Sequence, residues 1–394
     1  MFMLKLGARR NIKYKLNTPA FVSNLQGIGK VFYPKAPFPD TLFHGDTLNY
    51  LLSGIDPDAI HRLRKLVIYR LLRQRRLEDE RLLGLYYMIA IDGTGHLAFT
   101  KQHCVHCLKR TIKGVTFYLH QTLEAKLVAP GLGMALSVGT EFIENERQDA
   151  SKQDCELKAF YRLARRLKGD FPQLSICLLM DSLYAAKPVM ELCERNRWHF
   201  LITFKEGSAP AVFQDYEALI KLAPENMTKD EDKETGDCRT YRWVNNVDWN
   251  SRPVHVLENL EKTQEGQKRF VWVSSIPVDS DNVRKLAQKG QGGRCRWMIE
   301  NGFNIQKNGG YGLEHPFSEG NWAMKNFYLL MQIGHIFNQL MEKGNLLRER
   351  IETTMGSLKV FSERLWAQFT EVWMDLCRLR AILKQQIQIR FDTS

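Results

Sequence analysis

The segment Leu174–Met180 (LSICLLM) constrains the fold most, because it is an apolar run that ends abruptly at Asp181. A strand with one face in water alternates apolar and polar residues, whereas a run without such alternation is typical of a strand buried on both faces. A strand of that kind needs other elements packed on both sides of its sheet. The run therefore predicts an α/β fold with a central sheet.

The order of the elements around this run narrows the fold class. Expected helices cover Asp149–Lys168 and Ala186–Asn196, and the expected strands are Tyr86–Asp92, Thr116–Val128, Gly133–Ile143, Leu174–Met180 and His199–Phe204. A simple doubly wound fold would alternate strands and helices from the start, and this chain does not. Three strands followed by helix, strand, helix and strand predict an RNase H-like mixed sheet flanked by helices.

The rest of the chain divides around this core. Strand-like alternation over Thr240–Val247, Pro253–Asn259 and Arg269–Ser275, after a charged loop at Lys229–Asp237, predicts a β-rich insertion. Apolar residues at helical spacing over Phe327–Met341 and Phe361–Phe391 predict a helical C-terminal region. The expected parts are a basic helical region (1–84), an RNase H-like core (85–205 and 276–320), the insertion (206–275) and the C-terminal region (321–394).

The charge balance points to a polyanionic partner. The 394 residues contain 56 Lys and Arg against 44 Asp and Glu, a net charge of +12. Residues 1–84 hold 15 of these cations and 7 of the anions, so this region contributes +8 of the +12. Nucleic acid is the simplest partner for such a chain. We expect a cytoplasmic protein, because no apolar run is long enough for a membrane span and the eight cysteines do not suggest a disulfide scaffold.

Within the basic region, residues 57–83 read as an amphipathic helix that begins near Pro57 and Asp58. Its cationic face includes Arg70, Arg73 and Arg76, which we expect to contact DNA phosphates. A solvated charged face is the alternative interpretation of these arginines. No sharp helix-turn-helix pattern is present, so base recognition is left unassigned.

A second basic helix is expected from about Val283 to Asn308. Arg296, Glu300 and Lys307 lie on one stripe of this helix, since residues four apart are one turn apart and Lys307 follows about two turns later. One carboxylate between two cations can be an ordinary salt-bridge ladder, which is the alternative to a functional role.

Three carboxylates occupy informative positions. Asp92 ends the first expected strand, Asp181 ends the fourth, and Glu300 lies on the later helix. The first and fourth strands of an RNase H-like sheet are neighbours, so the two aspartates would converge there with the glutamate. Mg²⁺ prefers oxygen ligands, and paired metal ions can promote phosphodiester displacement. As alternatives, Asp92-Gly93-Thr94 is a turn and Asp181-Ser182 is a helix cap.

This set of residues resembles the DDE transposases of bacterial insertion sequences, especially the group named after insertion sequence four. That group carries a tyrosine, two residues, an arginine, three residues, a glutamate, six residues and a lysine. Arg296, Glu300 and Lys307 match the last three terms, whereas Gly293 stands at the tyrosine position. The IDGT around Asp92 and the apolar strand before Asp181 also look like family motifs. The resemblance covers about residues 85–315.

The resemblance implies a DNA transposase that cleaves transposon ends and joins them to target DNA. Asp92, Asp181 and Glu300 would be catalytic and would hold Mg²⁺ or Mn²⁺, as two ions. Arg296 and Lys307 would hold the DNA backbone beside the scissile phosphate. The implied partner is double-stranded DNA, namely the terminal inverted repeats and the target, bound by a homodimer in the bacterial cytoplasm. Two alternatives stay open: a nuclease of the same fold without joining activity, and a domesticated DNA-binding protein without catalysis.

A separate constellation follows the first expected strand. The sequence His103-Cys104-x-His106-Cys107 contains a Cys-x2-Cys spacing, which can supply half of a tetrahedral zinc site. No second Cys-x2-Cys follows, and neighbouring His and Cys side chains cannot all easily face one metal. We therefore favour a polar hairpin without metal, with structural zinc at Cys104 and Cys107 as the alternative. The sequence does not rank His96 and His120 as outside ligands.

Overall fold

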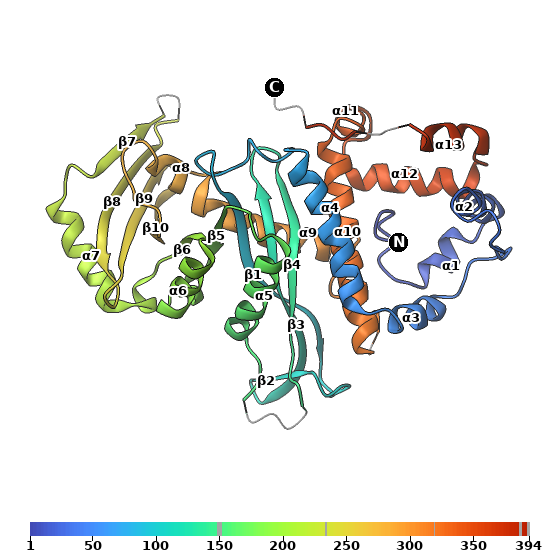
Figure 1. Cartoon of the computed structure of the whole chain (residues 1–394), viewed down its shortest axis with the longest axis horizontal. Helices are drawn as coiled ribbons and strands as arrows, with labels where there is room; N and C mark the ends of the chain where they lie inside the picture. Colours follow the sequence, from blue (N-terminus) through green and yellow to red (C-terminus); the bar gives the residue numbers. More distant parts are fainter. Residues whose placement is uncertain (148–151, 233–234, 319, 386–387, 392–394) are drawn as a thin grey trace.

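The computed structural model describes residues 1–147, 152–232, 235–318, 320–385 and 388–391. Within these residues, ten strands form one mixed sheet flanked by helices (Figure 1), so the predicted α/β class is confirmed. The hydrogen-bonded order is β2-β3-β1-β5-β6-β10-β9-β8-β7. β4 lies outside this order and also pairs with β3. The strands are β1 Tyr87–Phe99, β2 Leu108–Ile112, β3 Val115–Ala129, β4 Met134–Ile143, β5 Ile176–Met180, β6 His199–Thr203, β7 Met227–Glu231, β8 Cys238–Asp248, β9 Pro253–Thr263 and β10 Gly266–Ser274.

The helices cover the sheet and build both ends of the chain. They are α1 Asn11–Leu16, α2 Pro19–Phe32, α3 Gly45–Ser53, α4 Pro57–Arg73, α5 Glu156–Asp170, α6 Lys187–Asn196, α7 Pro210–Leu222, α8 Val283–Ala287, α9 Trp297–Asn308, α10 Asn321–Lys343, α11 Arg348–Arg350, α12 Leu358–Glu371 and α13 Leu376–Leu383. In the part of the chain that the structure describes, no helix is long and apolar enough to cross a membrane.

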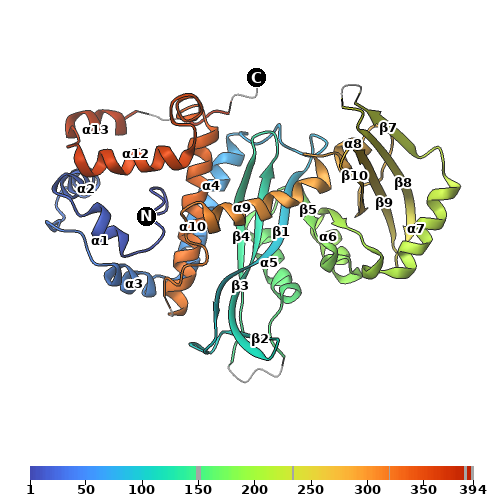
Figure 2. The same ribbon diagram turned by 180° about the vertical axis from the view of Figure 1, so that it is seen from behind.

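The position of β5 at the centre of the sheet explains why the run Leu174–Met180 is apolar. All five residues of β5 are buried, because β5 lies between β1 and β6 and pairs with both in parallel. β3 pairs with β1 and β4 in antiparallel orientation. Figures 1 and 2 show α5 on one face of these strands and α9 on the other. The expectation of a strand buried on both faces is confirmed.

The segment 206–275 continues the central sheet. Its last strand, β10, pairs in antiparallel fashion with β6, and β9, β8 and β7 follow in order. Two features were not expected. The segment begins with helix α7, which is amphipathic and buries Tyr216 and Ile220. β7 overlaps the start of the stretch predicted as a charged loop, because an edge strand that pairs on one side only tolerates the charged sequence MTKDE.

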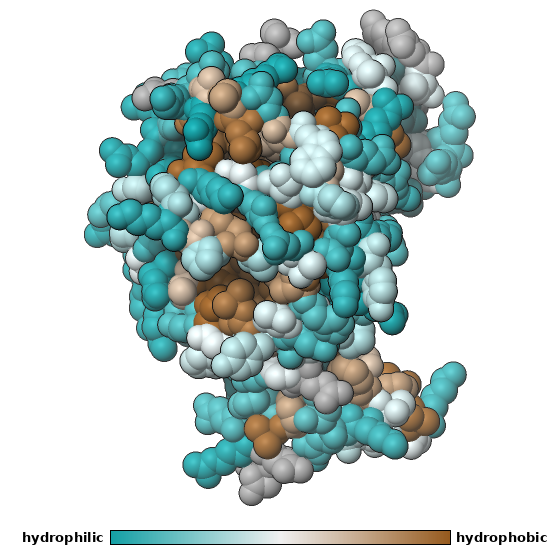
Figure 3. Space-filling model, turned by 90° about the vertical axis from the view of Figure 1, so that its right-hand side faces the viewer, coloured by the Kyte–Doolittle hydropathy of each residue, from teal (hydrophilic) through white to brown (hydrophobic). Residues whose placement is uncertain are grey.

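The N-terminal and C-terminal helices pack together, far from β7–β10 (Figure 1). Leu6, Ile12, Leu16 and Phe21 form a small core with Trp366 and Phe369. The Asn24 side chain donates to the carbonyl of Val372 at 2.7 Å and accepts from the Met374 amide at 2.6 Å. Figure 3 shows this end of the molecule as a largely polar surface with separated apolar patches.

The first basic helix begins at Pro57, as the sequence predicts, but it is shorter than expected. α4 ends at Arg73 instead of Leu83, and Asp56, not Asp58, caps its start by accepting from the Asp58 amide. Arg64, a further arginine of this helix, is buried, and its guanidinium donates to Ser137 at 2.9 Å and Thr140 at 2.5 Å. Two hydroxyl acceptors on β4 thus draw this arginine into the core.

The second basic helix is not continuous. The stretch 283–308 folds as α8, a turn, a short 3-10 helix at Gly292–Arg296 and then α9. Gly290 has φ 79° and Gly292 has φ 50°, a left-handed conformation that breaks an α-helix. The C-terminal stretch 361–391 is likewise broken between α12 and α13, where Asp375 starts a new helix by capping the Cys377 amide.

The helix expected over 149–168 is α5, Glu156–Asp170. The expected first residues, 149–151, lie outside the described residues, and the described helix begins after Cys155. The strands expected at 116–128 and 133–143 are confirmed as β3 and β4 to within one residue at each end.

Candidate active site

Asp92 does not end its strand, as the sequence suggested. β1 continues to Phe99, because its ladder with β3 runs on to the pair Phe99 and Tyr118 after the ladder with β5 has stopped at Ala90. Asp92 therefore stands two residues beyond the last parallel pair, opposite Glu124 of β3. The interpretation of Asp92-Gly93-Thr94 as a simple turn is wrong.

Asp181 follows β5 directly, and its strand is the hydrogen-bonded neighbour of β1, as expected. Its Oδ1 accepts a hydrogen bond of 2.9 Å from the Leu183 amide, which caps the 3-10 helix Ser182–Tyr184. The helix-cap interpretation is thus correct in geometry. The same carboxylate also lies close enough to Arg296 to contribute to raising the pKa of that guanidinium.

Arg296 connects two of the predicted catalytic residues. It stands at the start of α9, where its Nη1 lies 3.1 Å from Asp92 Oδ2 and its Nη2 lies 2.5 Å from Glu300 Oε1. Burial works against the charge of Arg296, but Glu300, Asp92 and Asp181 together raise its pKa. The fold therefore brings Asp92 and Glu300 to one guanidinium, although 208 residues separate them in sequence (300 minus 92).

The environment of Asp92 raises the pKa of its carboxyl group. Burial is the main cause that raises its pKa to about 6, and the nearby Glu300 and Glu156 carboxylates raise it further. Arg296 and the hydrogen bond from the Gly93 amide act in the opposite direction. Burial together with neighbouring charges is typical of functional carboxyl groups.

Glu156 is a fourth carboxylate that the sequence analysis missed. It opens α5, and its Oε1 accepts a hydrogen bond of 2.8 Å from the Tyr184 hydroxyl. Burial and the charge of Asp181 raise its pKa. A Cβ at Gly93 would lie 2.7 Å from Glu156 Oε2, so the glycine after Asp92 leaves room for this side chain. Glu156 was hidden inside an expected helix, away from the strand ends.

The carboxylates do not converge on one point. Among the described residues, one group of His, Cys, Asp or Glu side chains has all its ligand atoms within 4.8 Å of one another, and it does not contain Asp92, Asp181 or Glu300. Arg296 stands between Asp92 and Glu300 instead. The candidate ligand atoms of Asp92, Asp181 and Glu300 are nevertheless all oxygen, the type of ligand that Mg²⁺ and Mn²⁺ prefer.

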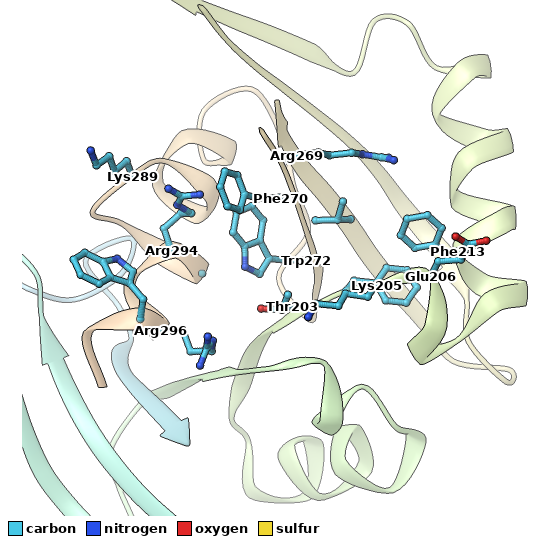
Figure 4. A pocket seen from close by; sticks show the side chains of 14 residues that line it. Thr203, Lys205, Glu206, Phe213, Arg269, Phe270, Trp272, Lys289, Arg294 and Arg296 are labelled. Carbon is cyan, nitrogen blue, oxygen red and sulfur yellow. The ribbon is translucent and has the colours of Figure 1, made fainter. Parts of the chain in front are cut away.

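A cavity of about 670 Å³ opens beside Arg296 (Figure 4). Its wall combines cations with aromatic rings, and of these residues only Arg296 was singled out in the sequence. Phe270 and Trp272 stack at 6.2 Å with an angle of 19° between their planes, and the Arg294 guanidinium lies 3.6 Å from the Phe270 ring centre. Lys205, Lys289 and Trp297 also line it.

Gly293, which stands where the signature in the resemblance has a tyrosine, packs directly against Trp272. A Cβ at Gly293 would lie 2.4 Å from Trp272 Nε1, so no larger residue fits there without moving the indole. Trp272 of β10 thus occupies the space beside the 3-10 helix that a tyrosine side chain would need. A strand pairing set by the β-rich segment decides this contact, so the spacing pattern around Arg296 could not reveal it.

The other predicted DNA contacts lie elsewhere. Lys307 is in the last turn of α9, about three turns or roughly 16 Å along the axis from Arg296, and it pairs with Glu314 at 2.9 Å. Arg70 and Arg73 are exposed on α4, whereas Arg76 is half-buried beyond its end. None of these four side chains lines the cavity.

A compact group of candidate metal ligands is the Cys/His cluster, which we define as His103, Cys104, Cys107 and His120. Its geometry could bind a metal ion. His106 is not a member, because its Nδ1 lies 2.9 Å from the Asn145 carbonyl oxygen. His120 of β3 takes the position that the sequence could not assign.

Comparisons with known proteins do not assign the chain to a family. No protein-family model matches the chain, and a search of curated proteins finds no match. The resemblance to the transposases therefore rests on the residues named above and on their arrangement.

Proposed function

We propose that this protein is a DDE-type DNA transposase that cleaves transposon ends and joins them to target DNA. One observation carries the proposal: Arg296 links Asp92 and Glu300 beside Asp181, at the point where the parallel strands β1 and β5 separate. Carboxylates gathered from three distant segments are costly for stability, so such a cluster favours a function.

The strand order supports an RNase H-like core as the setting for this activity. β4, β3 and β1 pair in antiparallel fashion, and β5 and β6 extend the sheet in parallel from β1. This arrangement agrees with the order that the sequence predicts, in which the first and fourth core strands are neighbours.

Asp92, Asp181 and Glu300 are the residues that would hold Mg²⁺ or Mn²⁺, because they supply the oxygen ligands those ions prefer. When bound, such ions activate an attacking oxygen and stabilise a leaving one in phosphodiester displacement. Arg296 forms ion pairs with two of these carboxylates. Its planar guanidinium can also bind phosphate oxygens in pairs, which suits a residue beside a scissile phosphate.

The cavity beside Arg296 supports a nucleic-acid substrate. Stacked rings and cations are the features with which proteins bind exposed bases and the phosphate backbone. Phe270 and Trp272 provide the rings, and Arg294 and Lys289 provide the charge. The exposed Arg70 and Arg73 on α4 would add backbone contacts outside the site, in a homodimer bound to double-stranded DNA.

The test is incubation of the full chain with DNA that carries its flanking terminal repeats and a target, with Mg²⁺ or Mn²⁺. We expect free 3′ hydroxyl ends and joined products, which sequencing of the ends would identify. Asp92→Asn, Asp181→Asn and Glu300→Gln should each remove both products and keep DNA binding. Glu265→Gln is the matched control, because Glu265 is an exposed carboxylate at the β9–β10 turn with a side chain 84% accessible.

The outcome separates the alternatives. Cleaved ends without joined products would replace the transposase with a nuclease of the same architecture. Specific DNA binding without any cleavage would indicate a domesticated DNA-binding protein. Wild-type cleavage rates in Asp92→Asn or Glu300→Gln would remove those residues from the active site and reject the proposed mechanism.

A further inference from the structure

The Cys/His cluster lies outside the carboxylate site, at the root of the β2–β3 hairpin. His103, Cys104 and Cys107 come from the connection between β1 and β2, and His120 comes from β3. In Figure 1, β2 lies at the tip of the sheet that projects away from the helices. We propose that these four residues form a structural zinc site.

The distances between the ligand atoms match a tetrahedral site. Zinc bonds of about 2.3 Å to sulfur and about 2.0 to 2.1 Å to nitrogen place neighbouring ligand atoms roughly 3.3 to 3.8 Å apart. His120 Nε2 lies 3.5 Å from each cysteine sulfur, and the two sulfurs are 3.3 Å apart. His103 closes the group, with its Nε2 3.0 Å from His120 Nε2 and 3.9 Å from Cys107 Sγ. These five distances agree with the expected range to within about half an ångström.

Hydrogen bonds cannot satisfy this arrangement. His120 Nε2 faces the sulfurs of Cys104 and Cys107 and the Nε2 of His103 at the same time. One imidazole nitrogen carries either one proton or one lone pair, so it can make only one of these contacts as a normal hydrogen bond. A cation at the centre of the four atoms satisfies all of them together. A disulfide is a poor description, because its sulfurs would be about 2.05 Å apart.

The identity of the ligands favours zinc. Two thiolates and two imidazoles suit Zn²⁺, whereas Mg²⁺ and Ca²⁺ require oxygen ligands. Two thiolates balance the charge of Zn²⁺, so the bound site is neutral, and the two thiol protons pass to solvent. Neutrality matters here because Cys107 is only 1% accessible and His120 only 3%. Four protein ligands leave no coordination position for a substrate, which indicates a structural role.

Asn145 holds the loop in the shape that the site needs. Its side-chain amide donates to the Cys107 carbonyl at 2.9 Å, and its backbone amide donates to the His106 carbonyl at 3.1 Å. The neighbouring strand β2 has little packing of its own, since only Leu108 of its five residues is buried. A zinc ion would therefore fasten β2 and its loop to β3.

The first experiment measures metal in the full chain purified with a reductant and without chelator. Elemental mass spectrometry should find one zinc per chain. The double variant Cys104→Ser/Cys107→Ser and the single variant His120→Ala should lose it. Cys155→Ser/Cys377→Ser is the matched control, because both of these cysteines are exposed and lie outside the cluster, and it should keep the full zinc content.

A second measurement needs no variant, so it stands even if the substitutions unfold the protein. Zinc should protect Cys104 and Cys107 from alkylation, and a chelator should expose both, as peptide mass spectrometry would show. Co²⁺ added to the zinc-free protein should give the visible absorption of a tetrahedral thiolate site. Absence of stoichiometric zinc, full zinc in the double cysteine variant, or alkylation independent of zinc would each overturn the proposal. These readouts use no DNA, so they do not depend on the proposed function.

Discussion

The Cys/His cluster and the carboxylate site contain candidate metal ligands on one sheet, but the protein assembles them differently. In the Cys/His cluster, four ligand atoms already lie within 4.8 Å of one another. At the carboxylate site, a guanidinium stands between Asp92 and Glu300, and Glu156 and Asp181 lie nearby. The ligand atoms of the Cys/His cluster are close to one another, whereas the Arg296 guanidinium separates Asp92 from Glu300 at the carboxylate site.

The difference follows from charge. Neutral thiols and imidazoles can approach one another without a metal, but carboxylates repel each other and need a compensating cation. Arg296 is such a cation, paired with Asp92 and Glu300. The preassembled ligands of the Cys/His cluster suit an ion that stays bound to the fold. The separated carboxylates suit ions that bind together with a charged substrate. The type of ligand thus decides how far a metal site can be organised in advance.

The largest expected effect tests whether the two sites are independent. Asp181→Asn or Glu300→Gln should reduce end cleavage by more than about 1000-fold, roughly 4 kcal/mol in the barrier, because each removes a charge that would hold the ion. Zinc content should be unchanged. Cleavage assays and elemental analysis of the same samples measure both, and a parallel loss of zinc would break the distinction drawn here.

Removal of zinc should mainly cost stability. An ion present at a hundred times its dissociation constant stabilises the folded state by about 2.7 kcal/mol, so a chelator should lower the melting temperature by several degrees. The chelator should lower the melting temperature of Glu300→Gln by the same amount. Cys107→Ser should have a lower melting temperature than the wild type, and the chelator should not change it. Thermal unfolding with and without chelator measures this, and an unchanged wild-type midpoint would argue against a structural ion.

We expect the folded state to lose stability in acid, partly because of His61, which lies outside both sites. Burial, followed by the charge of Arg64, lowers the pKa of His61 to about 2, while the unfolded value is 6.5. The unfolded chain thus binds the proton first, so stability present above pH 6.5 is lost as the pH falls. The loss is about 2 kcal/mol between pH 6.5 and 5.

The variant His61→Gln tests how much His61 contributes to this loss of stability. Glutamine can still accept a hydrogen bond from Arg64, whose Nη2 lies 2.9 Å from His61 Nδ1. Denaturant unfolding at both pH values, in chelated protein, should show a weaker acid loss in the variant than in the wild type. Equal losses would place the acid sensitivity elsewhere. Any further acid loss seen only with zinc present would belong to the Cys/His cluster.

The smallest expected effect concerns DNA binding away from the carboxylate site. Arg70→Gln combined with Arg73→Gln should weaken DNA affinity and reduce the log–log salt slope by roughly 1.8, at about 0.9 for each lost phosphate contact. Lys221→Gln on α7 is the control, because it is an exposed cation on a helix far from α4 (Figure 1). An unchanged slope in the double variant would show that α4 presents only a solvated charged face.

The sequence by itself determined the features that depend on local pattern. The apolar run before Asp181 specified a strand buried on both faces, and β5 is such a strand. The order of the elements predicted that the strands of Asp92 and Asp181 are neighbours, and they are. The spacing of Arg296 and Glu300 placed them one turn apart, and they form an ion pair at 2.5 Å. Each of these inferences needs only the geometry of one helix or of adjacent strands.

Only the tertiary structure decided the contacts between distant segments. Glu156 reaches Asp92 because α5 begins there, Trp272 fills the space beside Gly293, and His120 joins the two cysteines across a strand pair. The periodicity of a segment shows which face is buried, but not which residue of another segment meets it. That depends on register and on where each helix starts, and here two left-handed glycines and the long β1–β3 ladder set both.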